Sequence, residues 1–543
     1  MKTLQQMLYN LRHEKGKGII FAEIGKDDNF CSYADLYEQS WRLLGGLQLL
    51  GISRNDYVIM QVKSNKDTVL LLWACLLGGI VAVPLTYAHT EDSFLKLKNI
   101  SGVLQSAYIV GSDTIASIMT SKNYFNGTEK LINYDEISSL NLGTLAEDVS
   151  IDDLSIIQFS SGTTGIPKGV LLTNKNIATN LEAISVAAKI NRIPSLTDLG
   201  ASWLPLTNDL GLVGFHLSGV YHIASTVMID AMSFFFEPTI LFEKIEKYRA
   251  TITINPYFAL EYLLGYFSRQ QDNSKKFDLS SLRLNICGSE PIKPQIVDSF
   301  ERTFSAFSLK ENTTLPVYGL AEACLAVSFS NTDNPYTTIS LDRDFLTIGN
   351  KIQITEDATR SVIFVSVGSA VPGTSISIRN ENNDEVTDGT VGIIYIKGDS
   401  LTSGYINNEQ STKELFSTDG WLNTFDIGVI VNGNLYIIGR QKDMIIMHGK
   451  NYYCVDLEKL ISQSIKAECA VVNEFNCETK NDDIYVFILQ ETDNSDFGEL
   501  ELTVKNILIK HFGITIKRVI LVNSFPRTEG GKVRRFLLKQ SIR

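Results

Sequence analysis

Hydrophobic and polar positions alternate between two periods along the first fifth of the chain. Residues 33–50 have the spacing of an amphipathic helix, and residues 57–62 form a short apolar run of strand length. A buried helix at 68–77 is followed by buried strands at 80–83 and 107–110. This alternation predicts an α/β fold of parallel sheets covered by helices.

The apolar run at residues 69–83 needs a separate test, because it is almost free of polar side chains. It is shorter than the roughly 20 residues that cross a bilayer. Gly78 and Gly79 interrupt it and Pro84 ends it. A buried helix that turns into a buried strand is therefore predicted, with no membrane span. The weakly patterned residues 122–148 predict an irregular connection.

Length, charge and cysteine content indicate which classes of protein the chain can belong to. A chain of 543 residues exceeds one ordinary domain. Its net charge of −12 and pI near 5.2 argue against general nucleic-acid binding. Seven cysteines without a Cys-x-x-Cys pair indicate reduced thiols rather than disulfides or a zinc site. Without an apolar leader at the start, we expect a cytoplasmic protein.

The most informative stretch covers residues 159–173. It reads Phe-Ser-Ser-Gly-Thr-Thr-Gly-Ile-Pro-Lys-Gly-Val-Leu-Leu-Thr, between the end of a buried strand and a helix that begins near Asn174. Its glycines let the backbone approach a ligand, and its N–H groups, hydroxyls and lysine suit a polyphosphate. The Walker spacing is absent from it. A phosphate-binding loop is predicted here.

This stretch resembles the phosphate loop of the acyl-adenylate-forming superfamily, which includes acyl-CoA synthetases, luciferases and peptide-synthetase adenylation domains. The resemblance implies ATP as cosubstrate and Mg²⁺ as the metal. Further matches are the turn Cys-Gly-Ser-Glu along the adenine, Tyr-Gly-Leu-Ala-Glu, Phe-Asp-Ile-Gly at the ribose, and Gly-Arg near the nucleotide. The implied nucleotide-binding residues are Ser161, Gly162, Thr163, Thr164, Gly165, Lys168, Gly288, Ser289, Glu290, Tyr318, Gly319, Asp426, Arg440 and Lys532.

Three of the matched residues carry the implied chemistry. Glu322 supplies a hard oxygen ligand for Mg²⁺, and Lys168 binds the phosphates. Lys532, in Arg-Thr-Glu-Gly-Gly-Lys near the C-terminus, bridges the substrate carboxylate and the α-phosphate. Attack of that carboxylate on the α-phosphorus of ATP gives acyl-AMP and pyrophosphate, and positioned cations stabilise the developing charge.

The region after the phosphate loop sharpens the resemblance to the fatty acyl-AMP ligases, which load fatty acids onto acyl carrier proteins. Residues 203–214 read Trp-Leu-Pro-Leu-Thr-Asn-Asp-Leu-Gly-Leu-Val-Gly, and Asn-Pro-Tyr-Phe-Ala follows at 255–259. The resemblance implies substrate-binding roles for Asn208, Asp209, Gly214, Tyr257 and Phe258. We expect the aromatic residues between 203 and 267 to border an apolar tunnel for a medium or long acyl chain.

Domain organisation also follows from the resemblance. It implies an N-terminal adenylate-forming domain at 1–441 and a small, mobile C-terminal domain at 442–543, with Lys442 as the hinge. Residues 331–363 resemble the insertion that separates acyl-AMP ligases from acyl-CoA ligases. Few residues follow Lys532, so we expect no fused carrier domain and a stand-alone carrier protein, or a carrier domain of an assembly line, as partner.

Charge is unevenly distributed in a way that fits such a partner. Residues 501–543 contain ten Lys or Arg and two Glu, in a chain of net charge −12. Carrier proteins are acidic, so a basic C-terminal segment would speed their encounter. A solvated basic tail is the other interpretation of this charge.

Three alternatives stay open at the level of sequence. An acyl-CoA ligase would use the same scaffold. An amino-acid adenylation enzyme is disfavoured, because no Asp follows residues 203–214 where an α-amino group would be held. A weakly active or non-catalytic paralogue is suggested by Phe425 and Asn208, which stand where the family has Gly and His. Cys454 replaces a common Pro.

Overall fold

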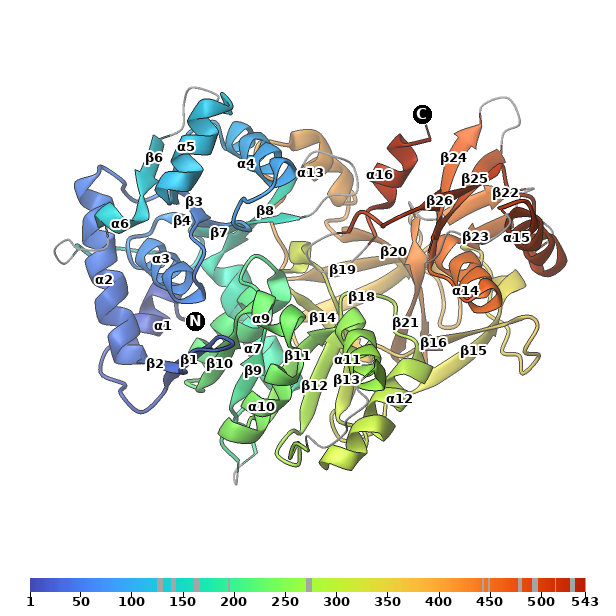
Figure 1. Cartoon of the computed structure of the whole chain (residues 1–543), viewed down its shortest axis with the longest axis horizontal. Coiled ribbons are helices and arrows are strands. Elements are labelled where there is room, and N and C mark those ends of the chain that lie inside the picture. The colour runs from blue at the N-terminus through green and yellow to red at the C-terminus, as the bar shows by residue number, and fades with distance from the viewer. Residues whose placement is uncertain are drawn as a thin grey trace.

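The computed structural model describes residues 1–124, 130–137, 143–160, 167–193, 196–269, 276–441, 444–447, 450–476, 481–490, 497–512, 514–527 and 533–542. In this part of the chain the strands form two large sheets, a four-stranded sheet and smaller ones. The helices pack around the large sheets, and the C-terminal elements lie at the end of the molecule beside β20 and β21 (Figure 1). The predicted α/β class is confirmed.

A six-stranded sheet occupies the N-terminal part, in the order β6-β5-β3-β4-β7-β8. Its strands are β3 (Tyr57–Gln61), β4 (Val81–Pro84), β5 (Ala107–Gly111), β6 (Lys130–Asn133), β7 (Leu154–Ser160) and β8 (Lys168–Thr173). Neighbouring strands are parallel except β7 and β8, which are antiparallel. The helices of this part are α2 (Tyr33–Leu49), α3 (Asn65–Leu77), α4 (Glu91–Leu104), α5 (Asp113–Ser121) and α6 (Tyr134–Ile137).

Helix α3 explains the apolar run that raised the membrane question. Every residue from Val69 to Leu77 is buried, because α3 packs against α2 and α1 (Leu4–Asn10) and against β4. The predicted helix and following strand are confirmed. None of the helices in the described ranges has the length and apolar character needed to cross a bilayer.

The irregular connection predicted at 122–148 is wrong in part. Strand β6 pairs in parallel with β5 at the edge of the sheet, and α6 follows it directly. The strand has only four residues, Lys-Leu-Ile-Asn, and two of them are apolar. So short a run leaves no readable period, and pairing with β5 supplies the order.

A nine-stranded sheet forms the second layer, in the order β17-β14-β13-β12-β11-β9-β10-β1-β2. Its core strands are parallel, and antiparallel strands form both edges. The strands are β1 (Gly18–Ala22), β2 (Asn29–Ser32), β9 (Gly200–Ser202), β10 (Thr226–Ile229), β11 (Ile252–Pro256), β12 (Leu284–Gly288), β13 (Thr314–Gly319), β14 (Ala326–Phe329) and β17 (Ser369–Ala370).

The helices of this second layer are α7 (Asn174–Ala187), the π-helix η1 (Leu210–Leu217), α8 (Ser218–Tyr221), α9 (Ala231–Phe236), α10 (Thr239–Tyr248), α11 (Tyr257–Arg269), α12 (Pro294–Phe304) and the 3₁₀ turns η2 (Ser305–Phe307) and η3 (Ala321–Ala323). Most of them connect its parallel strands, while α7 leads in from β8 and η3 joins the antiparallel strands β13 and β14. Helix α7 begins where predicted. Its N-cap Thr173 accepts from the backbone N–H of Asn176 in a capping box, so β8 passes directly into the helix.

A four-stranded antiparallel sheet follows, made of β18 (Thr374–Arg379), β19 (Gly392–Gly398), β20 (Leu422–Val431) and β21 (Asn434–Arg440), with α13 (Glu409–Leu415) between β19 and β20. The segment predicted as an insertion forms the hairpin β15 (Thr338–Asp342) and β16 (Ser361–Val365) with the turn η4 (Arg343–Phe345). Ile339, Leu341 and Leu346 pack with β20 and β21 in one hydrophobic cluster.

The C-terminal elements have a hydrophobic core of their own, which runs from Ile445 to Val519. They are β22 (Met444–Met447), β23 (Lys450–Tyr453), α14 (Cys454–Ile465), β24 (Cys469–Asn476), β25 (Asn481–Leu489), α15 (Phe497–Phe512), β26 (Arg518–Val522) and α16 (Arg535–Gln540). The strand end at Arg440 and the new strand at Met444 agree with the sequence. The domain boundary at 441/442 stays a prediction.

Candidate active site

Two antiparallel strands hold the ends of the predicted phosphate loop. Ser160 at the end of β7 pairs with Lys168 at the start of β8, and Phe159 pairs with Gly169. The loop is thus shorter than the predicted 159–173, because β8 already begins at Lys168. A Cβ at position 169 would come within 2.8 Å of the side chains of Ile157 and Phe159, so only glycine fits the packing there.

Lys168 and Glu322 are distant in sequence but meet at the side chain of Tyr405. The Tyr405 hydroxyl donates a 2.7 Å hydrogen bond to Oε1 of Glu322. Nζ of Lys168 lies 4.9 Å from the centroid of the Tyr405 ring. Burial, and then the Glu322 carboxylate, raise the pKa of Tyr405, so the phenol keeps its proton and acts as the donor. Lys168 and Glu322, which are both predicted to act on phosphates, therefore contact the same side chain, that of Tyr405.

Asp426 is a buried carboxylate with two donors from protein side chains. Its Oδ2 accepts a 2.6 Å hydrogen bond from the Tyr318 hydroxyl, and its Oδ1 accepts a 2.7 Å bond from Nε of Arg440. The Asp426 side chain is 6% exposed, whereas that of Arg440 is 53% exposed. Burial, followed by the charge of Asp426, raises the pKa of Tyr318 well above its ordinary value. Each oxygen of Asp426 retains acceptor capacity for a further hydroxyl.

The residue before Asp426 adopts a backbone conformation that favours glycine. Phe425 has a φ of 59°, and the register between β19 and β20 shifts at this point. The Asn423 side chain accepts from the N–H of Phe425 at 2.8 Å, and the Thr424 hydroxyl accepts from the N–H of Asp426 at 3.1 Å. These bonds hold the irregular backbone, so Asp426 lies opposite Arg440 on β21.

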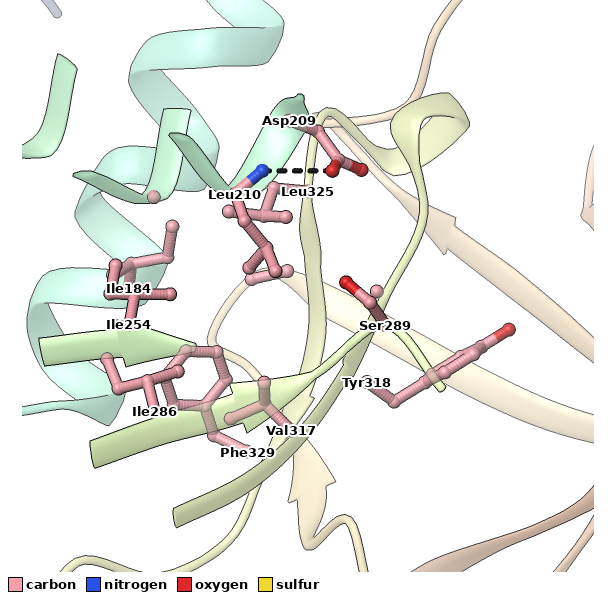
Figure 2. Close-up of a pocket in the computed structure, with 13 residues that line it drawn as sticks. Ile184, Asp209, Leu210, Ile254, Ile286, Ser289, Val317, Tyr318, Leu325 and Phe329 are labelled. Atoms are coloured by element: carbon pink, nitrogen blue, oxygen red, sulfur yellow. Dashed lines mark hydrogen bonds between the residues drawn. The ribbon is translucent and has the colours of Figure 1, made fainter. Parts of the chain in front are cut away.

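A pocket enters the molecule beside this cluster, between η1, α7 and the carboxyl ends of β11, β12 and β13 (Figure 2). It encloses about 470 Å³ with its open mouth included. Asp209, Ser289 and Tyr318 lie on one side, and Ile184, Ile254, Ile286 and Phe329 lie on the other. The pocket is thus polar next to Asp426 and apolar at depth.

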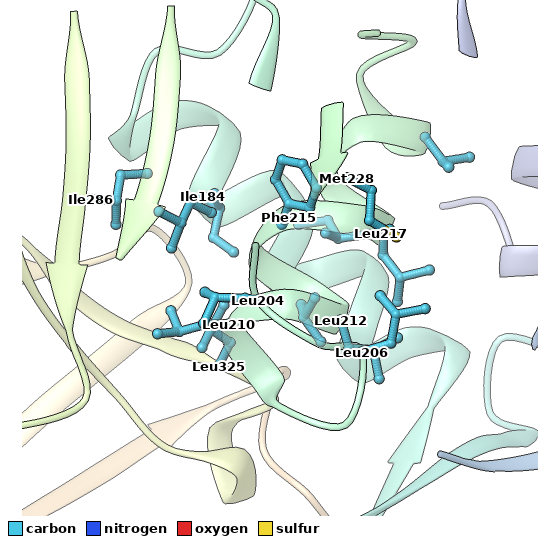
Figure 3. Packing of buried hydrophobic residues seen from close by; sticks show 14 of the residues in the cluster. Ile184, Leu204, Leu206, Leu210, Leu212, Phe215, Leu217, Met228, Ile286 and Leu325 are labelled. Carbon is cyan, nitrogen blue, oxygen red and sulfur yellow. The ribbon is translucent and has the colours of Figure 1, made fainter. Parts of the chain in front are cut away.

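Close packing fixes the apolar wall (Figure 3). Leu210 of η1, Ile184 and Ile286 line the pocket and belong to the main hydrophobic core, and Leu325 lies beside Leu210. A Cβ on Gly214 would lie 2.9 Å from Cδ2 of Leu325, so glycine lets η1 approach this wall. The helix starts where the Asn208 side chain accepts from the N–H of Leu210 at 2.8 Å, and Asp209 accepts from the same N–H at 2.9 Å.

This arrangement joins an aliphatic pocket to polar groups suited to a ribose and to phosphates. The model of the family described as AMP-binding enzyme matches residues 12–406, well over half of the 543 residues. The chain belongs to the AMP-binding enzyme family. The predicted superfamily is thereby confirmed, and with it an enzyme that forms adenylates.

Relatives of this AMP-binding enzyme cover nearly its whole length. The medium-chain-fatty-acid–[acyl-carrier-protein] ligase JamA of Moorena producens is 26% identical, over 98% of this chain and 94% of its own. The long-chain-fatty-acid–AMP ligase FadD28 of Mycobacterium tuberculosis is also 26% identical, over 93% of this chain and 90% of its own.

Solved structures agree with these relatives. A fatty acyl-adenylate ligase, from work on the Escherichia coli and Legionella pneumophila enzymes, superimposes with a TM-score of 0.88 at 29% identity. That match covers 100% of this chain and 98% of the other. McyG A-PCP with phenylalanyl-adenylate gives a TM-score of 0.83 at 26% identity, over 99% and 95% of the two chains.

Several predicted residues of this AMP-binding enzyme fall outside the described residues. They are Ser161, Gly162, Thr163, Thr164 and Gly165 of the phosphate loop, the hinge residue Lys442 and the catalytic Lys532. Their roles stay predictions. The residues that flank Lys532 are described: Arg527 and Val533 form an antiparallel bridge, and the N–H of Arg534 bonds the carbonyl of Pro526 at 2.7 Å.

The turn predicted to lie along the adenine follows β12 and reaches the pocket. Gly288 ends β12 and packs closely on Val317, and Ser289 has a φ of 73° and lines the pocket. Gly319 lies against the backbone of Leu325, where a Cβ would clash with the carbonyl oxygen. Burial is the main reason why the pKa of Tyr257 and of Cys287 is raised, and the charge of the nearby Glu290 adds to both shifts.

The aromatic residues between 203 and 267, which we expect to border an acyl tunnel, do not line the pocket described here, and their role in acyl binding stays a prediction. Trp203 stacks on Phe234 at 4.1 Å, and Phe235, Phe258 and Tyr262 complete this aromatic cluster. The residues lining the pocket are mostly aliphatic, and they include Asp209 and Gly214 but not Asn208, Tyr257 or Phe258. The Tyr257 hydroxyl instead donates to Glu261 at 2.8 Å. Trp203 and Phe234 are buried in the core, whereas Phe258 and Tyr262 are partly buried and Phe235 is exposed.

Residues of the site that sequence reasoning missed are Tyr405 and the aliphatic wall. Tyr405 follows Gly404 in a turn, and nothing near it in sequence points to Glu322 or Lys168. Ile184, Ile286 and Phe329 are ordinary core positions in the sequence. Ile184 lies on helix α7, Ile286 on the parallel strand β12 and Phe329 on the antiparallel strand β14, so only the packing of these three elements brings them to one pocket.

Proposed function

We propose that this AMP-binding enzyme activates a medium- or long-chain fatty acid to acyl-AMP with release of pyrophosphate, and then transfers the acyl group to the phosphopantetheine thiol of an acyl carrier protein. The observation that carries the proposal is the pocket, which is polar beside Asp426 and aliphatic beyond it. An alkyl chain gains roughly 0.8 kcal/mol for each buried CH₂, whereas its carboxylate needs polar surroundings.

The ribose end of the nucleotide is assigned to Asp426. Tyr318 and Arg440 each use one acceptor site of the carboxylate, on different oxygens. Each oxygen has two lone pairs, so both ribose hydroxyls can donate to Asp426 without displacing either partner. Ser289 and Gly319, on neighbouring strand ends, then border the adenine.

The phosphate end is assigned to Lys168, Glu322 and the loop between β7 and β8. Lys168 neutralises phosphate charge, and Lys532 would approach the carboxylate and the α-phosphate. A carboxylate and a triphosphate repel each other, so this cationic side of the site lowers the cost of bringing them together. The carboxylate oxygen forms the new bond to the α-phosphorus, and the bond to the β-phosphate bridging oxygen breaks.

The described residues offer a magnesium ion one carboxylate ligand, that of Glu322. Groups of three or more metal-binding side chains do not occur in the described part of the chain, and Glu322 is a single carboxylate. Mg²⁺ is commonly held by one or two carboxylates together with substrate phosphates and waters. Glu322 would hold the ion against ATP, where the ion would neutralise phosphate charge.

The acceptor is proposed from the relatives and from charge. JamA is named for transfer to an acyl carrier protein, and the segment 501–543 of this chain has ten basic and two acidic residues. The hinge at Lys442 and the domain boundary at 441/442 are part of the proposal, because the thiol must reach the acyl-AMP after Lys532 has acted.

Two assays in sequence test this function. Pyrophosphate release with ATP and dodecanoate is expected, and acetate should be used several orders of magnitude less well. Adding either CoA or a holo carrier protein then distinguishes the two ligases, and acyl transfer to the carrier alone is expected. Pyrophosphate release without dodecanoate dependence, or transfer to CoA alone, would contradict the proposal.

Amino-acid activation is a second candidate, favoured by one observation. Asp209 lines the pocket at its polar end, where a carboxylate could hold an ammonium group. McyG, bound to phenylalanyl-adenylate, has the same fold. The pyrophosphate assay should therefore include phenylalanine and leucine, for which we expect no release above background.

A further inference from the structure

A turn that precedes α13 is fixed against both sides of the predicted phosphate site. The N–H of Leu171 donates to the carbonyl of Gly404 at 3.1 Å, and the N–H of Ile406 donates to the carbonyl of Gly169 at 2.9 Å. Gly404 has a φ of 139° and lies against the side chain of Thr412, whose hydroxyl accepts from the N–H of Tyr405 at 3.0 Å. Tyr405 therefore has little freedom to move.

The same turn holds Glu322 at two points. The N–H of Thr402 donates to the backbone carbonyl of Glu322 at 2.9 Å. The Tyr405 hydroxyl donates to its Oε1 at 2.7 Å. A phenol bound to an ionised carboxylate makes a strong, charge-assisted bond, so the direction of the Glu322 side chain is set by Tyr405.

The ring of Tyr405 contacts the other charged residue. Nζ of Lys168 lies 4.9 Å from the ring centroid, within the range of a cation–π contact. Tyr405 is 7% exposed, so the surroundings of both contacts are largely dry. One side chain thus touches an anion through its hydroxyl and a cation through its ring.

We propose that Tyr405 is a positioning residue, which sets Glu322 and Lys168 in the mutual arrangement that binds a divalent metal–nucleotide complex. This inference rests on the proposed adenylating function, because that function makes a metal–nucleotide complex the ligand. It does not depend on which acid is activated. A long carboxylate and a long ammonium have several rotamers each, and holding them ready lowers the entropic cost of binding. Tyr405 supplies no atom to the reaction.

Tyr405→Phe isolates the hydroxyl, because it keeps the ring beside Lys168. Mn²⁺ binding is measured by electron paramagnetic resonance in the presence of a non-hydrolysable ATP analogue, without acid or carrier. We expect the affinity for the metal–nucleotide complex to fall about tenfold, as for one lost bond to a charged group. Affinity for metal-free AMP should stay within about twofold of the parent, because the ribose site is untouched.

Tyr336→Phe is the matched control. It removes a hydroxyl that donates a 2.7 Å bond to the carboxylate of Asp298, outside the site. It should leave Mn²⁺–nucleotide affinity unchanged. Thermal unfolding of both variants shows whether either loses the fold.

A double-mutant cycle tests whether Tyr405 acts through Glu322. If it does, Tyr405→Phe should weaken metal–nucleotide binding little further in a Glu322→Gln background. Tyr405→Leu, which also removes the ring, should weaken binding of metal-free ATP as well, through Lys168. Parental Mn²⁺–nucleotide affinity in Tyr405→Phe would overturn the proposal, as would equal losses for AMP and for the metal complex.

These measurements separate two kinds of failure. If no fatty acid supports pyrophosphate release, but Tyr405→Phe weakens metal–nucleotide binding selectively, the positioning role stands and the substrate proposal fails. If dodecanoate supports release and the variant binds Mn²⁺–nucleotide like the parent, the positioning role alone fails.

Discussion

The Tyr318 hydroxyl donates a 2.6 Å hydrogen bond to the Asp426 carboxylate, which joins the end of β13 in the large sheet to β20 in the four-stranded sheet. The two residues are 108 positions apart in the chain. Because Asp426 also binds Arg440, three segments meet at one buried carboxylate. The packing of the two sheets therefore involves the carboxylate that we propose as the ribose ligand.

Removing the Tyr318 hydroxyl should weaken nucleotide binding more than catalysis. Tyr318→Phe leaves Asp426 with Arg440 alone, and we expect the KM for ATP to rise about three- to tenfold with a smaller change in kcat. Steady-state pyrophosphate release measures both. Tyr221→Phe removes a comparable 2.6 Å bond to Glu182 outside the site and should leave the KM unchanged. An unaltered KM in Tyr318→Phe would count against Asp426 as the ribose ligand.

Phe425 has a φ of 59°, so its Cβ is strained where glycine would not be. We expect Phe425→Gly to lower the KM for ATP, because the backbone before Asp426 becomes free to adjust. Phe425→Ala keeps the strain and loses the ring. It should therefore be less stable than Phe425→Gly by about 1 kcal/mol in the free energy of unfolding, measured by denaturant titration.

The opposite order of stability, with alanine above glycine, would show that backbone strain does not govern this position. A higher KM for ATP in Phe425→Gly would show that the partly buried ring supports the site by packing. Phe425 contacts the main hydrophobic cluster, so this outcome has a physical basis.

Sequence motifs predicted Tyr318, Asp426 and Arg440 as members of one site, and the structure brings these three side chains together. Gly319 lines the pocket beside them, and the roles of all four toward a nucleotide stay predictions. Aromatic density in a sequence does not distinguish a pocket wall from a core, so it could not predict which residues line this pocket. Trp203 and Phe234 stack on each other, while Ile184 on α7 and Phe329 on β14, which carry no local signal, reach the pocket only through the packing of those elements.

The contacts of Tyr405 could not be predicted from the sequence, because they join residues that are far apart in the chain. Its bond to Glu322 joins positions 83 residues apart, and its contact with Lys168 depends on how the turn pairs with β8. Neither relation has a periodicity or spacing that one sequence reveals. Strand β6 was missed for a related reason, because its order comes from pairing with β5.

Replacing Phe329 should change the length of acyl chain that the pocket accepts. Phe329→Leu enlarges the apolar end, so we expect kcat/KM to shift toward longer acids by roughly fourfold for each further methylene admitted. A series from octanoate to hexadecanoate measures the shift. Phe234→Leu alters the aromatic cluster instead and should lower the Tm without changing the chain-length profile. The reverse pattern would restore the aromatic cluster as the acyl-binding wall.

Carrier loading should depend on exposed basic residues of the C-terminal segment. Arg535 is unsuitable for charge reversal, because it makes two 2.8 Å bonds to Glu458 and reversal would break this pair. Lys510, Lys517 and Arg518 are exposed, and the one 3.2 Å ion pair of Lys517 with Asp483 lies at the surface, where such pairs contribute little stability. Their joint replacement by Glu should slow acyl transfer to the carrier about tenfold at low salt and spare pyrophosphate release.

A matched control reverses Lys15, Lys26 and Lys63, which are also exposed and change the net charge equally. This variant should load the carrier at the parental rate. The difference between the two variants should shrink at high ionic strength, since the Debye length is about 8 Å at physiological salt. Equal slowing in both variants, or a fall in both half-reactions, would contradict a C-terminal docking surface.

We propose that the pocket holds a fatty acid and the polar cluster holds ATP, and that the enzyme joins them to form a fatty acyl-AMP. The most direct test is mass spectrometry of the enzyme incubated with ATP, Mg²⁺ and an equal mixture of acetate, dodecanoate, phenylalanine and leucine, without any acceptor. We expect the enzyme to form dodecanoyl-AMP and an equimolar amount of pyrophosphate. An aminoacyl-AMP as the main product, or no adenylate from a correctly folded enzyme, would contradict it.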